Sequence, residues 1–130
     1  MAAAQRPIEL IQARSLIASL TTAAFLVDEA GTLLFYNEAA EELLGMRFDQ
    51  AGELPADDWG SRFRPRVPGG RDLAVDELPL TIALRDGEPG HAHMEITGAH
   101  GEDHRIAVSA IPIRGRSGQH GAFAIFWPAD

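Results

Sequence analysis

The stretch 25–45, FLVDEAGTLLFYNEAAEELLG, constrains the fold of this 130-residue chain more than any other part of it. Gly31 separates two short apolar runs and suits the tight turn of a hairpin. Asn37 then follows the second run, 33–36, and is a favoured N-cap because its side-chain carbonyl accepts from amides two or three residues on. Gly45 suits the left-handed position that ends a helix. The stretch therefore predicts two paired strands followed directly by a short helix.

Composition excludes several classes of protein. The length predicts one domain, and the absence of cysteine excludes disulfides, thiolate metal sites and cysteine chemistry. A formal net charge of −8 argues against a nucleic acid bound through its phosphates. No stretch approaches the ~18 apolar residues of a membrane span, and the N-terminus lacks the pattern of an export signal. We therefore expect a cytoplasmic protein with no membrane partner.

The N-terminal residues 8–20 have apolar side chains at helical spacing. The apolar positions are Leu10, Ala13, Ile17 and Leu20. This stripe fits a helix packed on its own domain, and it fits a short dimerisation helix equally well. The residues alone leave both interpretations open.

Residues 46–75 are the least regular part of the chain. Prolines and a Gly-Gly pair prevent long elements there, so short helical turns and loops are expected. A cluster of arginines also falls in this part: Arg62, Arg64, Arg66 and Arg71. We interpret them as belonging to a solvated loop rather than to an anion site.

The rest of the chain predicts one helix and three strands. Residues 76–85 read as a helix with Asp76 as its N-cap and Pro79 in its first turn. Three strand-like runs follow at 91–97, 105–113 and 121–127, separated by turns at 98–101 and 115–118. The predicted order along the chain is therefore two strands, then helices, then three strands, which is an α+β pattern.

In this order the motifs closely resemble those of a PAS domain. The family opens with a strand, a D-x-x-G turn, a second strand and N-x-A-A-E-x-L-x-G, and this chain has DEAG followed by NEAAEELLG. The motifs ELPL, ALRDGEP and VSAIPI also match family segments in the expected order. The resemblance spans 16–127 and implies a PAS fold of bacterial type: a five-stranded antiparallel sheet with helices on one face around a small pocket. We divide the chain into a flanking helix, 1–20, and a PAS domain, 21–130.

The family register and strand alternation assign side chains to the two faces of the sheet. The predicted pocket lining is Phe25, Val27, Leu34, Tyr36, Leu44, Ile82, Met94, Ile96, Ile106, Val108, Phe123, Ile125 and Trp127, with Ala110 on the same face. The predicted outer face is Leu26, Leu33, Phe35, Ile111, Ala122, Ala124 and Phe126.

That outer face is too apolar to be left in water, so it needs a cover. The N-terminal helix is the candidate, from the same chain or from a partner, and the family commonly dimerises in this way. We therefore predict a homodimer. Its predicted interface is Leu10, Ile17, Leu20, Leu26, Phe35, Ile111, Ala124 and Phe126.

The resemblance also limits the cofactors. Flavin photochemistry in the family needs a cysteine in an N-C-R-F-L-Q helix, and the chromophore of the yellow photoreceptors is attached through cysteine; both are excluded here. Haem-binding members usually place an axial histidine on the long helix. Residues 76–86 contain none, which disfavours haem. The identity of any other cofactor stays open.

Two histidines are a possible metal site. His91 and His93 share one face of a predicted strand, and His-x-His can chelate zinc if Glu95 or a residue of a neighbouring strand supplies a third ligand. A polar edge strand explains the same pattern. We favour the edge strand and predict no metal.

The predicted lining is aliphatic and aromatic, with Tyr36 as its main hydroxyl. It suits a small apolar or aromatic ligand with one polar handle, and it suits a plainly packed core, which is the favoured interpretation. The Tyr36 hydroxyl then bonds either a ligand or a backbone carbonyl.

The sequence gives no sign of catalysis. It has no Ser-His-Asp arrangement with a nucleophile elbow, no P-loop and no G-x-G-x-x-G. We expect a sensory module of signal transduction, not an enzyme, that senses a small ligand, mediates homodimerisation, or does both, with a signalling protein as a further candidate partner. A ligand-free dimerisation module is the alternative, and a small-ligand enzyme is the least favoured. The ending 126–130 lacks the Asp-Ile-Thr-like turn that leads to an effector, which favours a free-standing or excised module.

Overall fold

The computed structural model describes residues 8–115 and 118–129 and has a five-stranded antiparallel sheet as its middle layer. The strand order across the sheet is β2-β1-β5-β4-β3. The strands are β1 (Ala23–Asp28), β2 (Leu33–Tyr36), β3 (Gly90–Thr97), β4 (Asp103–Gly115) and β5 (Gly118–Pro128). The predicted α+β fold with two N-terminal and three C-terminal strands is confirmed, although 116 and 117 of the predicted 115–118 turn lie outside the described residues.

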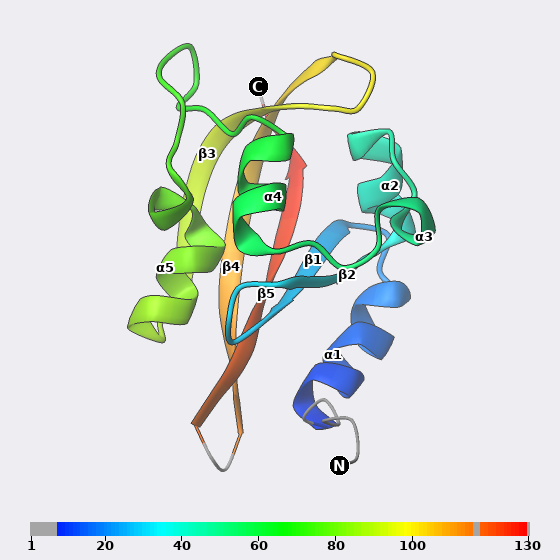
Figure 1. Cartoon of the computed structure of the whole chain (residues 1–130), viewed down its shortest axis with the longest axis vertical. Coiled ribbons are helices and arrows are strands. Elements are labelled where there is room, and N and C mark those ends of the chain that lie inside the picture. The colour runs from blue at the N-terminus through cyan, green and yellow to red at the C-terminus, as the bar shows by residue number, and fades with distance from the viewer. Residues whose placement is uncertain (1–7, 116–117, 130) are drawn as a thin grey trace.

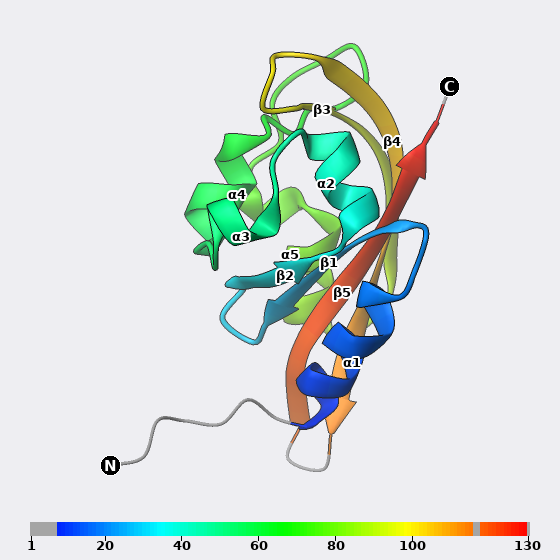
Figure 2. The ribbon, with the colours of Figure 1, turned by 90° about the vertical axis from the view of Figure 1, so that its right-hand side faces the viewer.

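Helices cover both faces of this sheet, as Figures 1 and 2 show. One face carries α2 (Glu38–Leu44), α3 (Phe48–Ala51), α4 (Ala56–Arg62), the 3₁₀ turn η1 (Val75–Glu77) and α5 (Pro79–Asp86). The other face carries α1 (Ile8–Ala18), which contacts β1, β2, β4 and β5. Residues 1–7 of the predicted flanking segment lie outside the described residues.

The opening motif folds as its residues predict. The Asp28 carboxylate accepts from the amides of Ala30 and Thr32, both at 3.0 Å, and Gly31 has a φ of +85°. Asn37 Oδ1 accepts from the amide of Ala40 at 3.1 Å and so caps α2. The helix ends at Gly45, which adopts the left-handed conformation with a φ of +74°.

The predicted N-cap at Asp76 is wrong. Asp76 lies inside η1, and α5 begins separately at Pro79 with Leu78 as its N-cap. A residue that precedes proline is disfavoured in the helical region because it clashes with the proline ring. Leu78 accordingly has a ψ of 143°, and this extended residue divides the predicted helix in two.

The side chains of β5 face the opposite sides of the sheet from those predicted. Val27 and Phe25 on β1 pair with Ala122 and Ala124, and Val108 on β4 pairs with Phe126. Direct partners in an antiparallel pair share a face. Ala122, Ala124 and Phe126 therefore face the helices, whereas Phe123, Ile125 and Trp127 face away. Both sets are apolar, so periodicity alone could not choose between them.

The prediction for β2 is wrong at two positions because the pairing of β1 with β2 is irregular. Phe25 pairs with Tyr36 and Leu26 pairs with Phe35, but Val27 pairs with Leu33. Leu34 is the extra residue of a β-bulge, which shifts the side-chain alternation. Leu33 therefore lies in the inner core and Leu34 in the outer one, opposite to the prediction.

The outer face of the sheet is covered by α1 of the same chain. Leu10 and Ile17 are buried there with Leu26, and Leu20 and Phe35 pack against them. Of the predicted dimer interface, Ala124 and Phe126 lie on the opposite face of the sheet. Ile111 pairs with Phe123, which places it on the outer face as predicted.

Candidate functional site

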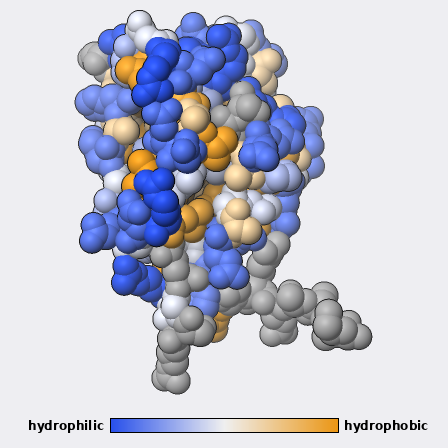
Figure 3. Space-filling view, turned by 60° about the vertical axis from the view of Figure 1, so that its left-hand side comes forward, coloured by the Kyte–Doolittle hydropathy of each residue, from blue (hydrophilic) through white to orange (hydrophobic). Residues whose placement is uncertain are grey.

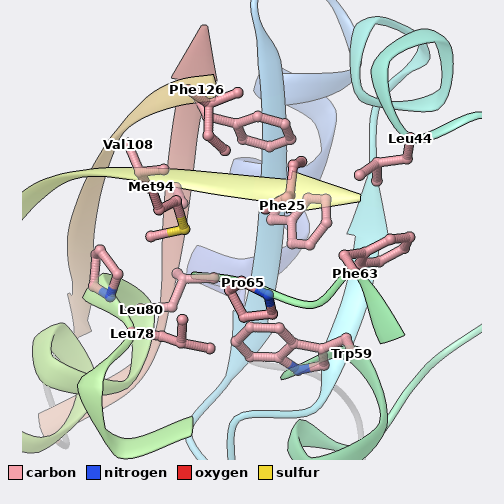
Figure 4. A pocket seen from close by; sticks show the side chains of 14 residues that line it. Phe25, Leu44, Trp59, Phe63, Pro65, Leu78, Leu80, Met94, Val108 and Phe126 are labelled. Carbon is pink, nitrogen blue, oxygen red and sulfur yellow. The ribbon is translucent and has the colours of Figure 1, made fainter. Parts of the chain in front are cut away.

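A small apolar cavity lies between the sheet and the helices (Figure 4). Its volume is about 70 Å³. Each of its fourteen lining residues is buried. The lining consists of Phe25, Leu44, Trp59, Phe63, Pro65, Leu78, Pro79, Leu80, Met94, Ile96, Ile106, Val108, Ala124 and Phe126. On the face that carries β3 and α5, patches of apolar side chains appear in the middle of a hydrophilic surface (Figure 3).

Phe25 of β1 is the central aromatic residue of the site. Its ring stacks on Tyr36 with the centroids 5.4 Å apart. The rings of Phe126, Trp59 and Phe63 meet it edge-on at 5.3, 6.4 and 6.5 Å. Such edge-to-face pairs fix ring orientation as well as position. The cavity therefore has a wall of mutually oriented rings.

Trp59 and Phe63 are lining residues that the sequence analysis missed. Both come from the irregular segment, where α4 ends, and their spacing of four residues puts them on one side of a helical turn. The Trp59 indole donates to the backbone carbonyl of Gly31 at 2.8 Å, which fixes α4 to the turn between β1 and β2. The i, i+4 pair of aromatic residues was the signal that could have located them.

Six of the predicted lining residues line the cavity: Phe25, Leu44, Met94, Ile96, Ile106 and Val108. Val27 and Tyr36 lie in the same core without reaching the cavity, and Ile82 is only partly buried on α5. Leu34, Phe123 and Ile125 pack under α1 instead, and Trp127 is 38% exposed. Pro65, Leu78, Pro79, Leu80, Ala124 and Phe126 complete the lining and were not predicted to do so.

The Tyr36 hydroxyl does not reach into the cavity. It donates to the backbone carbonyl of Met46 at 2.9 Å, which was one of the two predicted alternatives. The side chain is fully buried, and burial, reinforced by the charge of Glu41, raises the pKa of Tyr36 to about 12. The phenol is therefore a neutral structural donor.

The histidine pair has no third metal ligand within the described part of the chain. The rings of His91 and His93 lie 5.6 Å apart, and His91 Nδ1 is 3.1 Å from the Ser109 hydroxyl. Glu95 accepts instead from the Gly69 amide and from Arg105. No group of three or more metal-binding side chains occurs in residues 8–115 and 118–129.

Three arginines of the cluster Arg62, Arg64, Arg66 and Arg71 are in separate ion pairs. Arg62 pairs with Asp58 at 2.9 Å, Arg66 with Asp103 at 3.2 Å, and Arg71 with Glu77 at 2.7 Å. Arg71 and the Ala74 amide hold the pKa of Glu77 down at about 2. These carboxylate partners occupy guanidinium groups that an anion site would use.

Comparison with known proteins gives a consistent result. A family model described as the PAS fold matches residues 12–51. The PAS domain of a Colwellia psychrerythraea protein has a TM-score of 0.65 at 20% identity and covers 92% of this chain and 96% of its own. The PAS domain of nitrogen regulation protein NR(II) from Vibrio parahaemolyticus has a TM-score of 0.64 at 16% identity, with 90% and 97% covered. A Rhodobacter sphaeroides LOV protein has a TM-score of 0.74 at 16% identity, with 95% and 69% covered. No curated protein matches.

The strand order, the helices around an apolar cavity and these likenesses define the class: α+β domains with the PAS fold. The chain has the PAS fold, and the PAS family model matches the part of the chain that contains its opening motif. None of its described helices has the length and apolar character needed to cross a bilayer.

Proposed function

We propose that this chain is a sensory module of signal transduction that binds a small, uncharged, apolar or aromatic ligand in the cavity. The observation that carries the proposal is the cavity itself: about 70 Å³ of space with a lining of apolar side chains. Protein interiors are normally packed without voids larger than a water molecule, and genuinely empty cavities are apolar. Likeness to the PAS domain of nitrogen regulation protein NR(II) supports a role in signalling.

The lining also limits the ligand. Among the described residues around the cavity none has a charged or nucleophilic side chain, and the Trp59 indole N–H already has an acceptor. A polar ligand group would lose its water without a replacement hydrogen bond, which is unfavourable. The ligand is therefore hydrocarbon-like, and the proposed activity is binding rather than catalysis.

Native mass spectrometry and an absorption spectrum of the purified protein test this proposal. A bound small mass that is released on unfolding, or a visible band, supports the sensory function. If the protein carries no ligand and takes up none of the small hydrocarbons offered to it, the core is merely packed. The ligand-free interaction module is then the better description.

A second function, homodimerisation, is favoured by the side of α1 that faces away from the sheet. Ile8, Ile11 and Leu16 are 63%, 56% and 62% exposed, although Leu10 and Ile17 of the same helix are buried. Large exposed apolar side chains on a helix that already buries one face favour a second contact. We infer that two copies meet through the outer side of α1.

Light scattering across a dilution series tests the dimer. Ile11→Glu is expected to shift the protein to a monomer, and Gln50→Glu, which places the same charge at an exposed position of α3 on the other side of the sheet, leaves the dimer intact. A compact wild-type monomer at micromolar concentration would contradict the proposed dimer.

A further inference from the structure

A segment outside the sheet closes the cavity on the side of β3. The chain between α4 and η1 runs along the edge of β3, where Figure 1 shows it as a green loop. We call residues 63–73 the strap. Phe63 and Pro65 of the strap line the cavity, so the segment that borders the β3 edge is also a wall of the site (Figure 4).

The strap is held to β3 by backbone hydrogen bonds. Arg66 and Glu95 exchange two such bonds, both at 2.9 Å, and the Thr97 amide donates to the Phe63 carbonyl at 2.7 Å. The strap thus adds a short strand-like piece to the sheet edge. Few bonds hold it there compared with the β3–β4 ladder, which pairs eight residues of each strand.

One side chain reinforces this attachment. The Arg66 guanidinium donates to the Thr97 hydroxyl at 2.9 Å and to the Asp103 carboxylate at 3.2 Å. Thr97 donates to the same Asp103 oxygen at 2.8 Å. The Thr97 hydroxyl and then the Arg66 charge hold the pKa of Asp103 below its usual range. The Arg66 side chain is only 12% exposed, less than that of Arg62 or Arg71, although its partner Asp103 is exposed.

The strap also contains the strained backbone position of the described chain. Arg64 has a φ of +47° and is the only non-glycine residue with a positive φ in the part that the structure describes. Such a conformation is unfavourable for a residue with a long side chain, and it persists only where surrounding contacts impose it. Release of the strap would relieve this strain.

We propose that the strap is the gate of the cavity: it opens by local detachment from β3, pivots near Arg64, and is latched closed by Arg66. The inference rests on the proposed ligand-binding function. Four observations support it: strap residues form part of the cavity wall, few bonds hold the strap at the β3 edge, the Arg66 side chain is largely shielded from water, and a strained backbone position lies close to it. Low local stability of this kind is what elements that admit ligands need.

Hydrogen exchange measured by NMR tests the opening without any ligand. The amides of Glu95 and Thr97 point to the strap, and those of Met94 and Ile96 point the opposite way because alternate residues of a strand do. Arg66→Met, which keeps the aliphatic bulk, is expected to speed exchange at Glu95 and Thr97 about tenfold. Exchange at Met94 and Ile96 stays unchanged. Arg47→Met, which removes an exposed ion pair elsewhere, changes neither pair of amides.

A second variant acts in the opposite direction. Asparagine tolerates positive φ better than arginine, so Arg64→Asn is expected to slow exchange at Glu95 and Thr97 severalfold. Equal acceleration of all four amides in Arg66→Met, or no response in either variant, overturns the gate.

The link to the cavity is tested with benzene as the probe. Line-shape measurements on Arg66→Met are expected to give faster entry and faster exit by a similar factor, with Kd nearly unchanged, because the closed cavity is not altered. Unchanged benzene rates alongside faster amide exchange contradict the gate and leave the binding function intact. Absence of benzene binding in both proteins counts against the binding function, while the amide data still decide whether the strap opens.

Discussion

Asn37 donates from its side-chain Nδ2 to the backbone carbonyl of Ile17 at 2.9 Å, which joins the start of α2 to the last turn of α1. The same nitrogen donates to Thr22, and the side-chain oxygen accepts from Ala24 as well as from the helix amide that it caps. Asn37 is 1% exposed and is the only buried polar residue in the described part of the chain. The Asn37 side chain therefore links α1, which covers the outer face of the sheet, to β1 and to the start of α2 on the opposite face.

Replacement of Asn37 is expected to damage stability more than an ordinary helix cap would. Asn37→Ala removes the cap and leaves several buried backbone groups without partners, so the free energy of unfolding falls by about 3 kcal/mol. Asn37→Asp keeps the acceptor oxygen but places a carboxylate oxygen next to the carbonyl oxygens of Ile17 and Thr22, which repel it. This variant is therefore also expected to be less stable at pH 7. Urea unfolding measures both. A loss below about 1 kcal/mol in both variants would mean that the amide is only a cap.

The sole tyrosine gives a clear alkaline signature, because the chain has no cysteine and all eleven of its basic residues are arginine. The pKa of Tyr36 is raised to about 12 in the folded protein, against about 10 in the unfolded chain. The unfolded chain therefore releases the proton first, and this contribution to stability, complete below pH 10, is lost as the pH rises from about 10 to about 12. Tyrosinate absorbance of native and urea-unfolded protein measures the two values. Coincident titrations would contradict the account.

Tyr36→Phe separates the hydroxyl from the ring. The variant loses the bond to the Met46 carbonyl and is expected to be about 1 kcal/mol less stable at neutral pH. Its stability should no longer fall specifically between pH 10 and pH 12. A variant with the same alkaline profile as the wild type would assign that loss to other groups.

Filling the cavity should stabilise the protein, whereas overfilling its surroundings should not. Ala124 lines the cavity, and its direct partner Ala110 on β4 is fully buried away from it. Ala124→Val is expected to raise the free energy of unfolding by about 0.5–1 kcal/mol, and Ala110→Val to lower it by about 1–3 kcal/mol. Equal losses in both variants would show that no usable space lies beside Ala124.

Glycine at position 121 is required by close packing of β5 on β1. A Cβ there would overlap the backbone carbonyl of Val27, whereas a Cβ at Gly90 would make only ordinary contacts, the nearest at 3.8 Å. Gly121→Ala is expected to cost more than about 2 kcal/mol of stability, and Gly90→Ala much less. Thermal unfolding of the two variants checks this, and equal melting temperatures would contradict it.

The fold was predictable because local signals agreed with one another. The Asn37 cap, the Gly31 turn and the order of apolar runs each favoured the same elements. The faces of the sheet were less predictable. Every residue from Ala122 to Trp127 is apolar, so the sequence of β5 does not indicate which side chains face the helices. The bulge at Leu34 arises from the pairing of β2 with β1, and no local sequence pattern predicts it.

The candidate site was predictable only where regular strands build it. Met94, Ile96, Ile106 and Val108 follow from alternation on β3 and β4. The opposite wall comes from the irregular segment and from the break at Leu78. Its residues reach the cavity through tertiary packing of short elements, which spacing along the chain does not encode.

The central claim, that the apolar cavity receives a ligand, is tested most directly by NMR of the ¹⁵N-labelled protein under xenon, with Ala124→Val as the matched control. An apolar cavity that stays dry takes up xenon. The account predicts saturable shifts at the amides of Phe25, Trp59 and Met94, and their reduction or loss in Ala124→Val. Shifts spread over the surface, or the same shifts in the filled variant, would contradict it.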